Sequence, residues 1–369
     1  MKLIGFFYRT FLKPFLFRKD PEVVHDNMLA LGERLGKSRS ARFLIAKTLQ
    51  YKHEALRQHV CGIDFANPVG LAAGFDKNGK LIDILPCVGF GFEEIGSITY
   101  EPCAGNPKPR LGRLPKSRGI VVHYGLPNEG AGHVLKNLSA RSFAFPLGIS
   151  IAKTNLPKTA DKDAGIADYA GGFALAVQSK VGDYIALNIS CPNAYGGEPF
   201  TNARDLEDLL AVLSRISNKK PVFIKLPADI SESECGELLS VCKKYSVSGI
   251  IVSNLTKDRL SPAVDQNEIR ASLPNGGISG KPTFEKSNKL IGFACEYFKN
   301  DFVIVGCGGI FSAEDAYQKI RLGASLVQLI TGMIFEGPQL IAEINRGLVR
   351  MLKRDGFANI REAVGVDIA

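Results

Sequence analysis

From about residue 61 onward, short runs of apolar and β-branched residues alternate with longer stretches in which apolar residues recur at helical spacing. The longer stretches predict helices that include residues 205–217, 232–245, 284–298, 313–322 and 338–353. The eight short runs predict strands at residues 68–74, 92–99, 147–153, 184–190, 222–226, 249–254, 302–306 and 326–331. Alternating strands and helices imply a parallel sheet, and eight such units favour a closed α/β fold, the (β/α)8 TIM barrel, over an open doubly wound sheet.

We expect the chain to divide into an N-terminal helical segment, residues 1–60, and a barrel, residues 61–369. Residues 21–58 predict one or two helices, broken near residues 36–40. Charge supports the same division. The 369 residues include 46 Lys and Arg and 37 Asp and Glu, for a net charge of +9, and most of that excess lies in the N-terminal segment. The barrel is nearly neutral, which excludes the basic surface that nucleic acid would need.

The first nineteen residues combine aromatic and basic side chains. Phe7, Phe11 and Phe15 recur every four positions and would form one helical stripe, although Pro14 should kink or divide the helix. Basic residues interrupt the apolar run, so it is too short to span a bilayer and is not typical of a secretory signal. Two interpretations remain open. The segment lies in the headgroup region of an anionic membrane, or the helix packs on the protein's own body.

The remaining composition is that of an ordinary globular protein. Hydrophobic residues make up 45% of the chain and charged residues 22%, which excludes disorder as the main state. The eight cysteines form no C-x-x-C pair and have no His at metal-ligand spacing, so we expect no metal site. Without a signal peptide, reduced thiols in a cytosolic compartment are the expectation.

Polar residues lie where the predicted strands end, which is where TIM barrels place their chemistry. Asn188 and Asn193 bracket Cys191 after the fourth strand. Two amides beside a thiol suit a polar planar ligand on which a base acts, although a lone Cys is also compatible with a buried structural thiol. Lys77 follows the first strand, where it could face an anion or remain a solvated lysine of a glycine-rich turn.

Other strand ends indicate a phosphate-bearing cofactor. Lys225 and Asn254 end the fifth and sixth strands, and a buried lysine there needs a negative partner, either a reduced flavin or an acid inside the barrel. Glycine-rich segments at 276–280, 306–310 and 331–332 resemble the phosphate site of such barrels. These features favour FMN, while NAD, pyridoxal phosphate and sugar phosphates remain possible. No G-x-G-x-x-G follows the first strand, so a Rossmann site has little support.

Eight motifs, taken in order, resemble the FMN-dependent dihydroorotate dehydrogenases: GLAAGFDKNG, GFGFEEIGSIT, GNPKPRLGRLP, LNISCPN, IKLPAD, GGISGKP, VGCGGI and GASLVQLITGMIFEGP. The helical N-terminus with DPEVVHD is similar to the quinone-linked, membrane-associated class 2 branch. The resemblance implies oxidation of dihydroorotate to orotate, a step of pyrimidine biosynthesis, with FMN as cofactor and a quinone as electron acceptor. It also implies a peripheral protein on the cytoplasmic face of the inner membrane, with residues 1–60 as the docking and quinone-access segment.

The resemblance also implies roles for individual residues. Cys191 would be the catalytic base, which removes the C5 proton while a hydride passes from C6 to flavin N5. Substrate-binding positions fall on Lys77, Asn188, Asn193 and Asn254. Positions of a quinone site fall on His25, Arg113 and Tyr124. FMN-binding positions fall on Ala73, Gly74, Ser97, Ser150, Asn188, Lys225, Ser253, Gly280, Gly309, Ile330 and Thr331.

Four positions depart from the family pattern. Cys191 stands where class 2 enzymes have Ser, as in the soluble class 1 enzymes, and a thiol with an unperturbed pKa of about 8.5 is easier to deprotonate than a hydroxyl. Val122 replaces an orotate-binding Asn, Leu255 a hydroxyl residue, and Ser150 a flavin-contacting Asn. Val122 and Leu255 keep open a related flavin oxidoreductase that desaturates a different small substrate. A third hypothesis, a non-catalytic flavin-binding or membrane-binding scaffold, would have no need for the polar residues at the strand ends.

Overall fold

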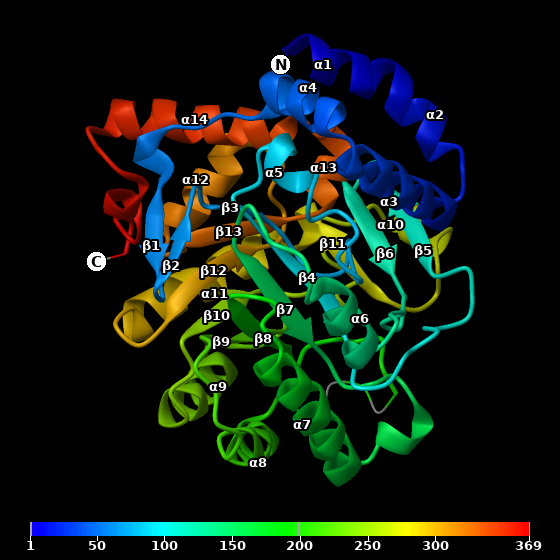
Figure 1. Cartoon of the computed structure of the whole chain (residues 1–369), viewed down its shortest axis with the longest axis vertical. Coiled ribbons are helices and arrows are strands. Elements are labelled where there is room, and N and C mark those ends of the chain that lie inside the picture. The colour runs from blue at the N-terminus through cyan, green and yellow to red at the C-terminus, as the bar shows by residue number, and fades with distance from the viewer. Residues whose placement is uncertain (1, 196, 198–199, 369) are drawn as a thin grey trace.

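A computed structural model describes residues 2–195, 197 and 200–368. Eight parallel strands close a barrel and follow one another around it in chain order (Figure 1). They are β3 (Val69–Leu71), β4 (Phe92–Ile98), β7 (Leu147–Ile151), β8 (Tyr184–Asn188), β9 (Val222–Leu226), β10 (Gly249–Val252), β12 (Val303–Cys307) and β13 (Leu326–Leu329). The predicted TIM barrel is confirmed, and each barrel strand overlaps one of the eight predicted runs.

Helices surround the barrel on its outer face (Figure 1). The five predicted helices are confirmed to within a few residues at either end. In α9, the Ser231 side chain accepts from the backbone N–H of Glu234, whose carboxylate accepts from Ser231 in return, so a capping box sets the helix start. The helices after β3 are α5 (Leu85–Val88), α6 (Ala131–Leu138), α7 (Lys162–Gln178), α8 (Ala203–Leu213), α9 (Glu232–Lys244), α10 (Gln266–Arg270), α11 (Phe284–Phe298), α12 (Ala313–Arg321), α13 (Thr331–Glu336) and α14 (Leu340–Asp355).

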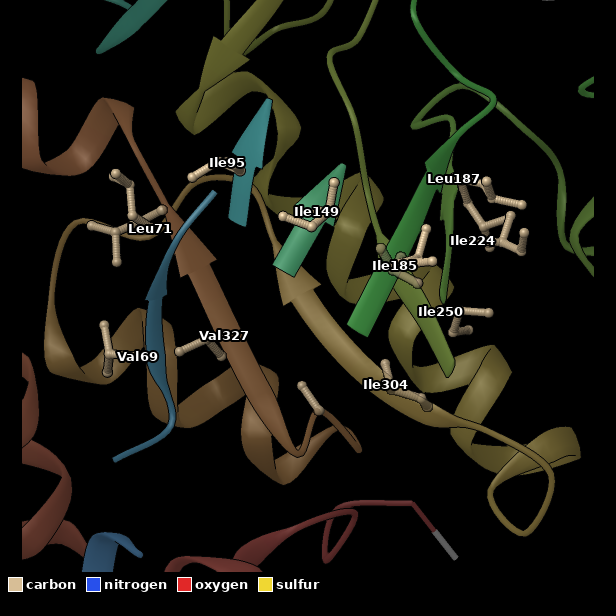
Figure 2. Packing of buried hydrophobic residues seen from close by; sticks show 14 of the residues in the cluster. Val69, Leu71, Ile95, Ile149, Ile185, Leu187, Ile224, Ile250, Ile304 and Val327 are labelled. Carbon is tan, nitrogen blue, oxygen red and sulfur yellow. The ribbon is translucent and has the colours of Figure 1, made fainter. Parts of the chain in front are cut away.

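The strands bury side chains on both faces, because alternate residues point into the barrel and toward the helices. Figure 2 shows the layer between strands and helices, to which Ile149, Ile185 and Ile250 belong. Inside the barrel, Phe92 has room because a Cβ on Gly70 of the neighbouring strand would lie 2.3 Å from its ring. Such pairs of a large and a small residue fill the barrel interior, so the barrel is a packed core and we look for its chemistry at the strand ends.

Two smaller sheets were not predicted from the sequence. An antiparallel hairpin, β1 (Gln58–Val60) and β2 (Ile63–Phe65), closes the bottom of the barrel, where the rings of Phe65 and Phe92 lie 5.2 Å apart. An antiparallel sheet of β5 (Leu111–Leu114), β6 (Gly119–Val122) and β11 (Gly277–Gly280) lies at the opposite end. The glycine-rich segment 276–280 is therefore mostly a strand rather than a loop, because it pairs with β6 along its length.

The N-terminal helices lie over the end of the barrel that holds the strand C-termini (Figure 1). They are α1 (Lys2–Phe7), a π-helical turn (Tyr8–Leu12), α2 (Lys13–Phe17), α3 (Pro21–Lys37) and α4 (Arg39–Leu49). The break expected near residues 36–40 is confirmed, and Ser38 caps the start of α4. The first helix runs on through Pro14 without a break, although a π-helical turn interrupts its α-helical hydrogen bonding. The wide π turn comes just before this residue, which has no N–H to donate.

The phenylalanine stripe of the first helices is exposed. Phe7, Phe11 and Phe15 are 59%, 58% and 55% exposed, so the stripe itself stays largely uncovered, although the helix that carries it does pack on the protein's own body, as one of the two interpretations expected. The opposite face makes that contact, since the Tyr8 hydroxyl donates to the carbonyl of Ile334 at 2.7 Å. Over the described part of the chain, no helix has both the length and the apolar character needed to cross a membrane.

A buried ion pair fastens α3 to the barrel. The Glu22 carboxylate is 5% exposed and accepts from Arg110 Nη2 at 2.7 Å and from Lys108 Nζ at 3.2 Å. Burial alone would raise the pKa of Glu22, but the hydrogen bonds from both cations lower it below its usual value. The pair therefore stabilises the docked helix at neutral pH, and this contribution is lost as the pH falls through the lowered pKa.

Replacing Glu22 by Ala should loosen α3, because Arg110 would remain buried without its acid. We expect a cost of about 3 kcal/mol, or roughly 100-fold faster amide hydrogen exchange across α3. The matched control is Glu33→Ala on the same helix, since Glu33 pairs with Lys37 at the surface and should contribute less than about 0.5 kcal/mol. Equal exchange in the two variants would show that the Glu22 pair does not hold the helix.

Candidate active site

A cavity of about 610 Å³ opens at the C-terminal ends of the barrel strands and extends between the N-terminal helices. Its far part is lined by apolar side chains of α1 to α4, including Ile4, Leu16, Met28 and Leu35. The sequence-predicted residues that it brings together are Ala73, Gly74, Lys77, Ser97, Asn188, Cys191, Asn193, Lys225, Asn254, Ile330, Thr331, His25, Arg113 and Tyr124. One cavity thus joins the predicted catalytic residues to the predicted quinone residues.

A smaller cavity of about 80 Å³ adjoins the first. Ser253, Gly280 and Gly309 line it, together with residues that the two cavities share, among them Lys225. Ser150 lines neither cavity. It is fully buried and reaches the site only through Ser97, with 2.8 Å between the two Oγ atoms. The proposed flavin contact at Ser150 is therefore indirect in this structure.

Asn188 is the centre of a buried polar network. From the end of β8 its Nδ2 donates to Ser97 Oγ at 2.8 Å, and its Oδ1 accepts from Asn254 Nδ2 at 3.1 Å. Asn254 also donates to the carbonyl of Ser190 at 2.8 Å, which ties the ends of β8 and β10 together. These bonds fix the orientation of both amides, so they can bind a planar polar ligand without reordering.

Cys191 lies in the loop after β8 and faces the larger cavity. Lys153, just past the end of β7, is a neighbour that sequence reasoning missed. Burial lowers the pKa of the Lys153 ammonium, while the charge interactions with Asp168 and Cys191 act in the opposite direction. Lys153 thus places a positive charge near the Cys191 thiol. Lys153 could have been found from the sequence, because it is the last residue of the third predicted strand and strand ends are where the site residues were sought.

The loop that carries Asn193 is held by side chains that the sequence did not single out. Asn106 Nδ2 donates to the carbonyl of Asn193 at 3.0 Å, and Asn155 Nδ2 donates to Asn106 Oδ1 at 2.9 Å. Asn193 Nδ2 donates to the carbonyl of Val122 at 3.0 Å, and its Oδ1 lies 3.4 Å from His123 Nδ1. These residues hold the loop in which Asn193 follows Cys191, but they do not line the larger cavity themselves, Val122 excepted.

Lys77 is placed to bind an anion. Its Nζ lies 4.0 Å from the centre of the Tyr124 ring, on the wall of the larger cavity. Burial lowers the pKa of Lys77 to about 8, although the nearby carboxylates of Asp76 and Asp26 raise it. The ammonium is therefore mostly protonated at neutral pH and provides positive charge in a partly desolvated site.

His25 and Tyr124 form one unit of the predicted quinone site. The carbonyl of Phe75 lies 2.8 Å from His25 Nε2, and the Tyr124 hydroxyl lies 3.3 Å from His25 Nδ1. Burial, and then the charge of Lys77, lowers the pKa of His25 to about 4, so the imidazole is neutral. Its Nε2–H then donates to Phe75, and its Nδ1 accepts from Tyr124.

Arg113, the third residue of that predicted site, is tied to the end of the first helices. Its guanidinium donates to the carbonyls of Phe17 and Lys19 at 3.2 and 2.7 Å and lies 4.7 Å from the centre of the Phe17 ring. It therefore has both a structural role in docking α2 and a place on the cavity wall.

The two apolar departures from the family pattern lie close together. Val122 pairs with Gly277, and a Cβ on Gly277 would lie 2.6 Å from Leu255 Cβ and 3.3 Å from Pro192 Cγ. Val122, Leu255 and Pro192 all line the larger cavity, so this part of the site has an apolar wall.

The residues present fit a phosphorylated flavin. After β12, Gly308 and Gly309 have φ values of +114° and +73°, and a Cβ on Gly309 would lie 2.5 Å from Phe284 Cβ. The turn therefore presents backbone to the smaller cavity, as a phosphate site requires. Lys225, only 4% exposed, provides charge where the two cavities meet. Within the described ranges, no group of three or more His, Cys, Asp or Glu side chains is placed to hold a metal ion.

Known proteins are similar to this chain in sequence and fold. The sequence model of the family described as Dihydroorotate dehydrogenase matches residues 55–352. Relatives named Dihydroorotate dehydrogenase (quinone) include those of Trichodesmium erythraeum, 36% identical, and Natronomonas pharaonis, 38% identical, and each alignment covers 97% of this chain and 98% of the relative. The crystal structure of DHODH from Eimeria tenella in complex with ferulenol is similar with a TM-score of 0.80 at 28% identity, covering 94% of this chain and 96% of that one. The chain therefore belongs to the dihydroorotate dehydrogenase family.

Proposed function

We propose that the protein oxidises dihydroorotate to orotate with FMN as cofactor and transfers the electrons to a quinone. The observation that supports this most directly is the single cavity that joins Cys191 and its amides to an apolar passage between the N-terminal helices. The relatives named Dihydroorotate dehydrogenase (quinone) have the matching activity in their names. A polar reaction site continuous with an apolar passage suits a small anionic substrate and a lipophilic acceptor.

In this proposal, each polar residue acts on the substrate. Lys77 binds the carboxylate of dihydroorotate, while Asn188, Asn193 and Asn254 hold the ring through its amide groups. The Cys191 thiolate, near the positive charge of Lys153, removes the proton from C5. FMN, when bound, would supply the redox chemistry that oxidises dihydroorotate and reduces the quinone, and Lys225, Ser253, Gly309 and Thr331 are among the residues that would hold it.

The quinone in this proposal enters between the N-terminal helices. The neutral His25, the Tyr124 hydroxyl and Arg113 provide polar groups in an otherwise apolar passage. Residues 1–60 then form a docking and quinone-access segment on a barrel of residues 61–369, and the exposed Phe stripe with its basic neighbours contacts the membrane. We assign the protein to the cytoplasmic face of the inner membrane as a peripheral protein.

The direct test is anaerobic mixing of the FMN-loaded protein with dihydroorotate in a stopped-flow instrument. The flavin absorbance at about 450 nm should fall as the substrate reduces the flavin, and added quinone should restore it. Substrate at about 1 mM, the upper end of usual KM values, is sufficient. No bleaching under these conditions would contradict the proposed substrate.

The apolar wall of Val122 and Leu255 favours a second candidate, a flavin oxidoreductase that desaturates a small substrate with an apolar edge. Replacing Val122 by Asn would restore a hydrogen-bonding group worth about 1 to 3 kcal/mol to a polar ring. Under this candidate, the variant should gain dihydroorotate turnover by roughly 10-fold or more, measured as flavin bleaching. The isosteric control is Val122→Thr. A Val122→Asn variant that only loses turnover already present in the wild type would reject the second candidate.

Removing residues 1–19 should weaken membrane binding. Exposed aromatic rings and neighbouring cations bind anionic interfaces, with about 1 kcal/mol for each Lys or Arg near the surface. We expect the truncated protein to partition onto anionic vesicles at least about 10-fold less than the full chain in a sedimentation assay. Zwitterionic vesicles are the control for charge. Equal partitioning of the two proteins onto anionic vesicles would refute the interfacial role of the segment.

A further inference from the structure

Lys319 is a fully buried lysine that the proposed reaction does not use. It lies on α12 with 0% exposure, although lysine is almost never fully buried unless it is paired. Its Nζ donates to Ser287 Oγ at 2.9 Å and to Asn288 Oδ1 at 2.8 Å, both of which are neutral. Among the residues that the structure describes, no carboxylate forms an ion pair with this ammonium. Within the described part of the chain, the Lys319 amine is thus bonded to neutral side chains and has no carboxylate partner.

The ammonium lies directly behind the glycine turn that lines the smaller cavity. Ser287, which accepts from Lys319, is also 2.8 Å from the carbonyl of Cys307, the last residue of β12. Lys319 Nζ lies 5.0 Å from the centre of the Phe284 ring. The glycine turn packs against Phe284 as well, because a Cβ added to Gly309 would lie 2.5 Å from Phe284 Cβ. Lys319 is therefore separated from the turn by single side chains only.

The other charged groups around Lys319 do not neutralise it. Asp315 forms an ion pair with Lys281 at 2.7 Å, Glu285 is exposed, and burial raises the pKa of the Cys307 thiol. Burial lowers the pKa of Lys319 to about 7, with Cys307, Asp315 and Glu285 opposing the shift and Lys281 adding to it. Without a further anion, the lysine is therefore only about half protonated at neutral pH.

We propose that Lys319 supplies a positive charge to the phosphate of the bound flavin nucleotide, acting through Ser287 and the glycine turn rather than by direct contact. The inference rests on the proposed function, because it needs FMN in the smaller cavity. The phosphate is the negative partner that Lys319 lacks, and its charge favours the ammonium form. Binding then takes up a proton above a pH of about 7, so FMN affinity falls as the pH rises from about 7 toward the raised pKa of the complex.

The experiment compares FMN with riboflavin, which has the same ring system and lacks the phosphate. Holoenzyme is incubated with increasing riboflavin, and the fraction of FMN displaced gives the ratio of the two dissociation constants. Lys77, whose pKa is lowered to about 8, faces the ring site and affects both flavins alike, so the ratio isolates the phosphate. The phosphate itself titrates at a pH of about 6 and is constant above a pH of about 7.5.

In the wild type, the preference for FMN should fall by up to about 10-fold per pH unit above a pH of about 7. In Lys319→Met, the preference at neutral pH should be about 10- to 100-fold smaller and independent of pH. The matched control is Lys220→Met. Lys220 precedes β9 at the opposite end of the barrel, and its Nζ donates to the backbone carbonyls of Ala176, Ser179 and Val181 at the end of α7 and just after it. This variant therefore loses hydrogen bonds but should keep the preference for FMN.

An unchanged preference in Lys319→Met overturns the proposal. If that variant does not fold, a wild-type preference that stays constant from a pH of about 7.5 to about 9.5 overturns it as well. Purified protein that binds neither flavin would overturn the proposed function together with this inference. Protein that keeps FMN while its preference does not depend on Lys319 would overturn this inference alone.

Discussion

Replacing Cys191 by Ala should slow flavin reduction by dihydroorotate by a factor of about 100 to 10,000, because a positioned general base typically contributes that much. FMN content and the fold should not change, since the thiol is proposed to act on the substrate and not on the cofactor. The measurement is the rate of flavin bleaching at saturating substrate. Cys191→Ser should retain activity that rises further with pH, because a hydroxyl loses its proton less readily than a thiol.

The matched control for this experiment is Cys61→Ala. Cys61 lies in the turn of the β1–β2 hairpin, at the other end of the barrel, where its thiol is 3.9 Å from the carbonyl oxygen of Ser248. Its loss should leave the bleaching rate as it is. If Cys191→Ala keeps more than about a tenth of the wild-type rate, another group or a water removes the proton.

Orotate binding should weaken about 10- to 100-fold in Lys77→Met, since a hydrogen bond to a charged group contributes about 1.5 to 3 kcal/mol.

Lys77 should also make the affinity for orotate depend on pH. The pKa of Lys77 is about 8 in the free protein, and a bound carboxylate raises it. Affinity for the anion is therefore complete below a pH of about 8 and falls as the pH rises above it. Isothermal titration of orotate into FMN-loaded protein measures both effects.

Lys80→Met provides the comparison for Lys77→Met, because Lys80 is exposed on the same loop and does not line the cavity. It should bind orotate as the wild type does at every pH. Orotate affinity that is equal at a pH of about 7 and about 9.5 in the wild type would remove Lys77 from the substrate site.

The barrel was predictable because its strands are buried on both faces and therefore read as short apolar runs. Residues 222–226 and 326–331 are examples, and each overlaps an observed strand. The antiparallel sheet of β5, β6 and β11 was not predictable in the same way. Its strands are only four residues long and contain Gly112, Gly119 and Gly277, and the pairing of β11 with β6 joins segments that are far apart in the sequence.

Among the site residues too, those at the ends of barrel strands were predictable and those that depend on contacts between loops were not. Cys191, Asn188 and Asn254 could be placed at one site because all lie at strand ends, which a parallel barrel brings together. Asn106 and Asn155 could not, since they act by holding loop backbone, and loop contacts depend on the folded path of the chain. Ser150 was predicted as a flavin-binding residue, but it does not line the cavity. Its strand position was right, but the side chain lies behind Ser97 and not on the cavity wall.

The docking of the first helices has a consequence for the order of assembly. Tyr8 binds the carbonyl of Ile334, 326 residues later, and Arg9 pairs with Glu336 in the same short helix. The N-terminal helices are synthesised first, yet their partners belong to the last βα unit of the barrel, which also closes the ring by pairing β13 with β3. In a growing chain the aromatic, basic helices are therefore made long before the barrel residues that they pack against, so they cannot dock until the barrel is nearly complete.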